Sequence, residues 1–181
     1  YETVIDAEID PSVFTLEMAK ELSRAAEKVG KDCKIHFAVD TGMSRIGYQV
    51  TDESADEMAQ IAKLPHMIVE GMFTHFSKAD EYDKSFTYDQ IDRFQAMIRM
   101  MEQRGVGIPV RHCSNSAGIA EISAANMDME RAGITLYGLW PSEEVDHNSL
   151  ELKPVMELKT HVAYVKKLEA GRAISYGGSY I

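Results

Sequence analysis

The feature that most constrains this chain is a regular alternation of strand-like and helix-like stretches. Strand-like apolar runs occupy residues 2–9, 34–40, 66–76, 109–116 and 129–139. Stretches with the apolar period of amphipathic helices lie between them, at residues 11–31, 52–64, 88–105 and 117–123. Strands separated by such helices pair in parallel, because the helix carries the chain back to the start of the sheet. The sequence therefore predicts an α/β fold with about five parallel βα units.

Residues that favour helix ends support these boundaries. Pro11 suits the first turn of the helix at 11–31, and Gly30 suits its end. Thr51 or Asp52 can cap the helix at 52–64. Gly105 closes the long helix at 88–105. We therefore expect the helices to begin and end close to these positions.

The pattern changes near residue 152. Residues 152–181 alternate like strands, contain a turn at Gly171 and show no helical period. We expect residues 1–151 to form the βα part and residues 152–181 to begin a separate β-rich domain. The strand-like run begins at residue 2, directly at the start of the chain and without an initiator methionine, and the chain stops on the apolar Ile181. We therefore expect the chain to be a fragment.

Charge and composition exclude several classes of function. The formal net charge of −10 disfavours a nucleic-acid partner or an anionic membrane surface, since both require a basic face. No apolar run approaches the roughly 20 residues of a membrane helix, and no secretory signal opens the chain. Cys33 and Cys113 lie in apolar surroundings, where buried free thiols are expected. These observations predict a cytoplasmic protein.

Polar clusters follow four successive predicted strands. They are Asp40 to Arg45, the segment after His75, the pair Asn115 and Ser116, and Gly133 after Arg131. In parallel α/β folds the functional loops lie beyond the carboxyl ends of the strands. The four clusters therefore predict one shared site.

Each cluster also has a purely structural interpretation. Arg45 could be a solvated surface group, but behind Asp-Thr-Gly at a strand end it favours anion binding, with Asp40 fixing the loop. His75 could be a core histidine. Asn115 and Ser116 could cap a short helix, whose N-terminus could also bind phosphate.

Three further residues, Gly133, Arg131 and Tyr176, also allow a functional or a structural interpretation. Gly133 would let backbone N–H groups approach a phosphate. Arg131 lies in an apolar run, so it must be paired or functional. Tyr176 could simply flank a turn. His75, Asp80 and His112 lack the spacing of a metal site, so no metal is predicted.

These clusters, in this order, resemble the alanine racemases, which depend on pyridoxal phosphate. The segments that carry the resemblance are VDTGMSRIG, THFSKAD, HCSNSA, RAGITLYGLWP and ISYGGSY. The resemblance implies an eight-stranded βα barrel of the TIM type, followed by a β domain, in a head-to-tail homodimer. This chain would supply the last five barrel strands and the first strands of the β domain.

The resemblance also implies roles for individual residues. Arg131 would face the pyridine nitrogen of the cofactor, Arg45 its phenolic oxygen and the substrate carboxylate, and Tyr176 would act as a base in the partner subunit's site. The remaining residues would hold the phosphate or support these groups: Ser116, Gly133 and Ile134 for the phosphate, and His75, His112, Asn115 and Asp40 in support.

The chain departs from the family pattern in two places. The lysine that forms the Schiff base with the cofactor lies in a KANAYG-like motif in relatives, and nothing here matches it. Many relatives also carry a carbamylated lysine two residues before the aspartate of the loop motif, where this chain has Ala38. Support for Arg45 would then come from elsewhere, such as a bound anion.

The resemblance predicts a parent enzyme that interconverts L- and D-alanine by a two-base mechanism, for peptidoglycan precursor supply. The piece at hand is expected to be inactive alone. Alternatives are a serine or broad-specificity amino-acid racemase, and a non-catalytic pyridoxal-phosphate-binding barrel. An unrelated phosphate-binding barrel enzyme would explain Ser116 and Gly133 but leave Arg131 and Tyr176 without a role.

Overall fold

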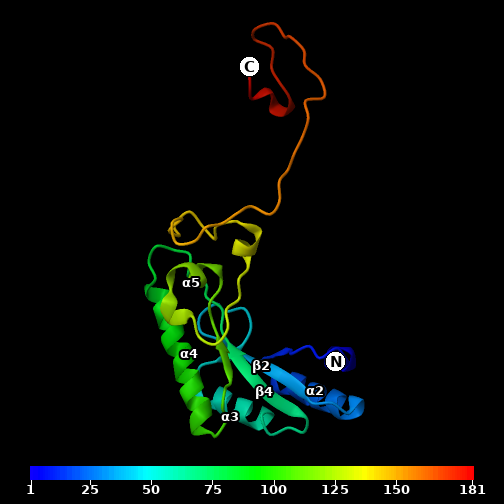
Figure 1. Ribbon diagram of the computed structural model, residues 1–181, viewed down its shortest axis with the longest axis vertical. Coiled ribbons are helices and arrows are strands. Elements are labelled where there is room, and N and C mark those ends of the chain that lie inside the picture. Colours follow the sequence, from blue (N-terminus) through cyan, green and yellow to red (C-terminus); the bar gives the residue numbers. More distant parts are fainter.

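A computed structural model describes residues 1–181, which form an open parallel sheet covered by helices, followed by an extended segment (Figure 1). Five strands make up the sheet: β1 (Ser12–Val13), β2 (Cys33–Asp40), β3 (Tyr48–Gln49), β4 (Met67–Phe73) and β5 (Val110–His112). Their order is β1-β2-β4-β5, with β3 paired to β2, and every pairing is parallel. The predicted parallel α/β fold is therefore confirmed, as a sheet that does not close on itself.

The helices lie between the strands as expected. They are α1 (Glu2–Asp6), α2 (Leu16–Val29), α3 (Asp52–Ile61), α4 (Ser85–Gln103) and α5 (Ser116–Glu121), with 3₁₀ turns η1 (Ser123–Ala125), η2 (Ile134–Tyr137) and η3 (Tyr176–Gly178). The Thr15 hydroxyl caps α2 by accepting from the Met18 N–H, and Gly30 ends that helix in the left-handed conformation. At α3 the cap is Thr51, one of the two predicted residues.

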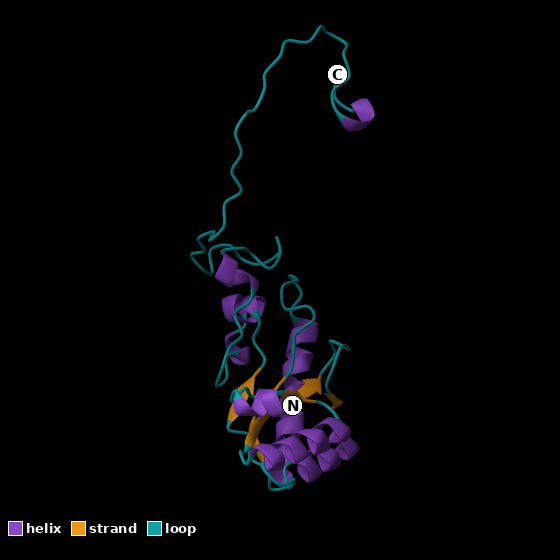
Figure 2. Ribbon diagram, turned by 90° about the vertical axis from the view of Figure 1, so that its right-hand side faces the viewer, coloured by secondary structure: helices purple, strands orange, loops and turns teal.

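One face of the sheet carries the core. Alternate side chains of β2, from Cys33 to Val39, are buried and belong to a single apolar cluster with residues of α2, α3 and α4. Figure 2 shows these helices gathered beside the strands. The opposite face of β2 carries Lys34, His36, Ala38 and Asp40, so the sheet presents its more polar side away from the helices.

The predicted first strand is wrong, because residues Glu2–Asp6 form α1. The β-branched residues Val4 and Ile5 are typical of a strand, but Ile5 is buried in the apolar core while Val4 is half-buried and Asp6 is exposed. Pro11 does not open a helix either. Its carbonyl accepts from the His36 N–H at 3.1 Å, which leads the chain into β1 at the edge of the sheet.

The predicted fifth strand at 129–139 is also wrong. The Arg131 N–H donates to the Ser114 carbonyl at 3.1 Å, but no ladder follows, and the chain turns into η2. A strand needs a continuous partner, and Ile134, Leu136 and Tyr137 remain exposed instead.

The segment 152–181 differs from the rest of the chain. It contains one isolated bridge, between Ile174 and Tyr180, and no strand. No residue after Val145 is buried, and Figure 1 shows the segment running away from the sheet towards the C-terminus. The start of a β-rich domain here stays a prediction, because strands form only beside a pairing partner. No helix in the chain combines the length and apolarity needed to cross a membrane.

Candidate functional site

A row of two histidines and an arginine crosses the polar face of the sheet at its carboxyl end. The Nδ1 atom of His36 on β2 lies 2.9 Å from Nε2 of His112 on β5, although β4 runs between these strands. Gly71 of β4 makes this contact possible. A Cβ atom there would lie 2.5 Å from His36 Nδ1, so only glycine leaves room for the two rings to meet.

Arg131 continues this row from the loop after α5. One terminal nitrogen donates to His112 Nδ1 at 2.7 Å and to the His112 carbonyl at 3.2 Å. The other donates to the Thr74 carbonyl at 2.7 Å and lies 3.5 Å from His75 Nδ1. The guanidinium carbon stands 5.4 Å from the centre of the Phe73 ring. Arg131 is thus held by carbonyls, imidazoles and a ring face, without a carboxylate partner.

These contacts fix the protonation of the histidines. A guanidinium only donates, so His112 Nδ1 must accept, and His112 Nε2 then carries the proton that it donates to His36 Nδ1. Burial, the Arg131 charge and His36 together lower the pKa of His112 to about 3. Burial also lowers the pKa of His36 and that of His75, the latter with help from Arg131 and Arg45. The row therefore carries its positive charge on the arginine alone.

Ser116 and Gly133 lie together, as the sequence predicted. The Ser116 hydroxyl accepts from the Gly133 N–H at 2.9 Å and from the Thr135 hydroxyl at 3.1 Å. Asn115 caps α5 by accepting from the Gly118 N–H at 3.0 Å. Because α5 has only six residues, its dipole contributes little to anion binding. An anion beside Ser116 and Gly133 would instead be bound by a hydroxyl and by backbone N–H groups.

Asp40 organises the loop that carries Arg45. Its carboxylate accepts from the N–H groups of Gly42 and Ser44, at 3.0 and 2.9 Å, and from the Gln49 amide at 3.0 Å. Burial alone would raise the pKa of Asp40, but these hydrogen bonds lower it overall. Arg45 itself is exposed. Asp40 therefore shapes the loop, and Arg45 stays available at its tip.

A cavity of about 280 Å³ joins several of these residues. Its lining consists of His75, Asp80, Asn115, Ser116, Ala117, Arg131, Gly133, Ile134 and Pro141. The sequence predicts six of these for one site, and the structure brings them to one cavity: His75, Asn115, Ser116, Arg131, Gly133 and Ile134. Asp80 adds a carboxylate to the lining. Three of the four predicted polar clusters therefore meet at one cavity, whereas none of residues 40–45 lines it.

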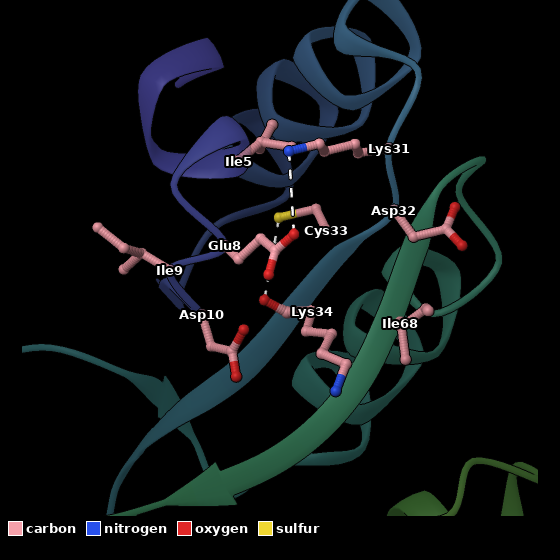
Figure 3. Close-up of a pocket in the computed structure, with 9 residues that line it drawn as sticks. All are labelled: Ile5, Glu8, Ile9, Asp10, Lys31, Asp32, Cys33, Lys34 and Ile68. Atoms are coloured by element: carbon pink, nitrogen blue, oxygen red, sulfur yellow. Dashed lines mark hydrogen bonds and ion pairs between the residues drawn. The ribbon is translucent and has the colours of Figure 1, made fainter.

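A larger cavity, of about 520 Å³, lies at the other end of the sheet (Figure 3). It is lined where β2 and β4 begin, by residues that include Cys33, Lys34 and Ile68. Lys31 on its rim pairs with Asp6 and Glu8, at 3.1 and 3.9 Å. In βα barrels this end of the sheet contributes to stability rather than chemistry. The smaller cavity is therefore the candidate site.

The donor set of the smaller cavity fits a phosphorylated pyridine. The Arg131 Nε is the one guanidinium nitrogen with no hydrogen-bond partner, so it can donate to a ring nitrogen. The Ile134 N–H also has no hydrogen-bond partner, and the Ser116 hydroxyl lies beside it for a phosphate. No group of three or more His, Cys, Asp or Glu side chains lies close enough to hold a metal ion.

Five residues named from the sequence do not line this cavity: Asp40 and Arg45 on the loop after β2, His112 on β5, Ala38 and Tyr176. Tyr176 is fully exposed in η3 of the extended segment. Ala38, which stands where many relatives have lysine, is buried on β2 beside Phe73 of β4. Sequence reasoning missed His36 and Gly71. The histidine in an otherwise apolar strand and the glycine in the next strand were the available signals, and only the strand register joins them.

The family model for the N-terminal domain of alanine racemase matches residues 1–141. The alanine racemase of Clostridium perfringens is 45% identical over 179 residues, which are 99% of this chain and 46% of that protein. The alanine racemase of Clostridium tetani is 42% identical over the same share. The chain therefore spans about half the length of the curated relatives it matches.

Solved structures show the same similarity. The alanine racemase of Clostridium difficile superposes with a TM-score of 0.91 at 40% identity, over 99% of this chain and 47% of that one. The alanine racemase of Streptomyces lavendulae gives 0.91 at 32% identity, over 99% and 48%. Both superpositions include nearly all of the extended segment.

Proposed function

Because this chain belongs to the alanine racemase family, we propose that it is part of an enzyme that interconverts L- and D-alanine with pyridoxal phosphate. The observation that carries the proposal is Arg131. It is a half-buried guanidinium without a carboxylate partner, and its Nε has a free N–H. The cavity that Arg131 lines also holds groups that can bind a phosphate, namely Ser116 and the backbone of Gly133 and Ile134.

The residues divide the work of holding the cofactor. Pyridoxal phosphate, when bound, withdraws electrons from an amino acid and makes its α-hydrogen acidic. Arg131 donates a hydrogen bond to the ring nitrogen, and because a guanidinium keeps its proton, that nitrogen stays unprotonated. Ser116 and the N–H groups of Gly133 and Ile134 bind the phosphate. A ring that withdraws electrons only weakly limits side reactions, which suits racemisation.

Arg45 and the supporting residues position the substrate. Arg45, exposed at the tip of its loop, binds the substrate carboxylate and the phenolic oxygen of the cofactor. Asp40 holds that loop, while His75, His112 and Asn115 hold Arg131 and the phosphate corner. The supporting histidines stay neutral, so they orient the guanidinium without competing for its ligand.

We assign Tyr176 to proton transfer at the α-carbon in the site of a partner subunit. Its full exposure in this chain fits a residue that acts elsewhere. In such a homodimer each site would take one base from each subunit. Residues 152–181 would then begin a β domain, a proposal supported by superpositions that cover 99% of the chain. The enzyme would act in the cytoplasm and supply D-alanine for peptidoglycan.

The test is an activity assay on the complete polypeptide that carries this chain. We expect it to bind pyridoxal phosphate and to racemise alanine faster than serine and other amino acids. Residues 1–181 alone should be inactive, because no lysine here matches the KANAYG-like motif. Racemisation by residues 1–181 alone would contradict this.

The same assay separates the alternatives. Faster turnover of serine, or equal turnover of many amino acids, would indicate a serine or broad-specificity racemase. Cofactor binding without turnover of any amino acid would indicate a non-catalytic pyridoxal-phosphate barrel.

A further inference from the structure

A fully buried glutamine on α4, Gln90, connects the loop after β2 with the loop after β4. Gln90 has no exposed surface, which is rare for a polar side chain of its size. Its Nε2 donates to the Thr41 hydroxyl and to the His75 carbonyl, both at 3.1 Å. Its Oε1 accepts from the Ser77 N–H at 3.1 Å. Both the oxygen and the nitrogen of the side-chain amide are therefore hydrogen-bonded.

The orientation of this amide is determined by its partners. A backbone N–H can only donate, and a backbone carbonyl can only accept. The oxygen must therefore face Ser77 and the nitrogen must face His75. The side chain cannot turn over without losing both contacts, so Gln90 holds its neighbours in one arrangement.

These neighbours lead directly to the proposed cofactor and substrate groups. Thr41 begins the loop that carries Arg45, and its hydroxyl lies 2.7 Å from the Thr74 hydroxyl. The Thr74 carbonyl accepts from Arg131 at 2.7 Å, and His75 lines the cavity. A single side chain thus links the loop after β2, the loop after β4 and the acceptor that holds Arg131.

We propose that Gln90 is a positioning residue that sets the distance between Arg45 and the Arg131–His75 pair. This inference rests on the proposed function. Gln90 does not line the cavity, so it acts through Thr41, Thr74 and His75 and contacts no ligand itself. Arg93, one turn further along α4, supports the same loop by donating to the Thr41 carbonyl at 3.0 Å.

The main test replaces Gln90 with leucine in the complete polypeptide. The side chains are similar in size, but leucine leaves Ser77, His75 and Thr41 without their partner. We expect the dissociation constant for pyridoxal phosphate to rise about tenfold, as the loss of one buried hydrogen bond would produce. Amide hydrogen exchange at Gly42 and Ser44 should also accelerate, because their loop loses its tie to α4.

Two variants on the same helix serve as controls. Thr87 is fully buried and its hydroxyl has no partner, so Thr87→Val should leave both measurements unchanged. Met97→Ala removes a fully buried apolar side chain and should lower the melting temperature without weakening cofactor binding more than about twofold. If Gln90→Leu fails to fold, Thr41→Val breaks the same link and should give a smaller rise in the same direction.

The outcomes separate the two proposals. A Gln90→Leu protein that binds the cofactor like Met97→Ala, with Gly42 and Ser44 still protected, would overturn the positioning role and leave the proposed function intact. If the unaltered protein binds no pyridoxal phosphate, the proposed function fails. The exchange rates at Gly42 and Ser44 would then still decide whether Gln90 ties the loops together.

Discussion

Two regions of this chain differ in how their residues are held. Up to Val145 the chain packs into one apolar core, and its last segment is fixed by contacts such as the Ser142 hydroxyl donating to the Asp80 carbonyl. From residue 152 onwards no side chain is buried, and Leu158 and Tyr176 are fully exposed. Arg131, in the first region, has several acceptors around it, whereas Tyr176 has no partner.

This difference in packing shows which of the proposed site residues are held in place by contacts within this chain. Hydrogen bonds within residues 1–149 position the groups that would hold the cofactor. The extended segment carries Tyr176, which is fully exposed here and which, under the proposed function, would act in the partner subunit's site. Under the proposed function the chain would supply the cofactor-holding groups of its own subunit's site and one residue, Tyr176, of the partner subunit's site.

The largest effect is expected at Tyr176. Tyr176→Phe in the complete polypeptide should lower racemisation by about 10²–10⁴-fold, the usual contribution of a general acid or base. Because the two enantiomers have equal free energy, kcat/KM must fall equally in both directions. Because Tyr176 would transfer the α-proton on one face only, the exchange of the α-hydrogen with deuterium from the solvent should slow for one enantiomer and not for the other. Unchanged rates would remove Tyr176 from the mechanism.

A smaller effect, of about 100-fold on cofactor affinity, is expected for Arg131→Lys. Lysine lacks the planar fork that lets Arg131 reach His112 and the Thr74 carbonyl together, and two charged hydrogen bonds are worth about 3 kcal/mol. Titration with pyridoxal phosphate measures it. Arg111→Lys is the matched control, since Arg111 pairs with Asp128 away from the cavity.

Acid should weaken the packed region through His112. Its pKa is about 6.5 in the unfolded chain and about 3 in the folded one, so between these values only the unfolded state gains a proton. The free energy of unfolding should therefore fall as pH drops below about 6.5, by about 1.4 kcal/mol per pH unit, and be flat above it. Burial lowers the pKa of His36 and of His75 as well, which adds to the slope.

Denaturant titrations at several pH values measure this slope. His112→Gln should make the slope shallower without abolishing it, because His36 and His75 still contribute. His161→Gln, at an exposed position in the extended segment, should keep the slope of the unaltered protein. Equal slopes in all three proteins would contradict the burial of a neutral His112.

The smallest effect is expected at Leu158. In residues 1–181 alone, Leu158→Ser should change the free energy of unfolding by less than about 0.5 kcal/mol, because the side chain is fully exposed. In the complete polypeptide the same change should cost about 2 kcal/mol, if the extended segment packs there as a strand. Equal effects in both proteins would mean that this segment stays unpacked.

Much of the packed region could be predicted from local patterns. β2, β4 and the helices between them follow from apolar periodicity and from caps such as Thr51. Three of the four polar clusters predicted at strand ends do lie together, because parallel strands end at one edge. That rule needs no knowledge of packing, and it located Arg131, Ser116 and Gly133.

The features that the sequence analysis predicted wrongly or did not find all depend on contacts between residues distant in the sequence. Residues 2–9 contain Val4 and Ile5, whose strand preference is overridden by packing of α1 against α2. Residues 129–139 lack a pairing strand, so their apolar pattern was not sufficient. His36 and Gln90 gain their roles only from register and burial across elements, which no local spacing reveals.

The most direct test of the central claim mixes two inactive variants of the complete polypeptide. Under the proposed function, Arg131→Leu removes a residue of its own subunit's site, and Tyr176→Phe removes one of the partner subunit's site. After unfolding and refolding together, half of the dimers would be mixed and each would hold one intact site, so activity should recover to about a quarter of the unaltered level. Activity no higher than the sum of the two variants would contradict the division of the site between this chain and its partner.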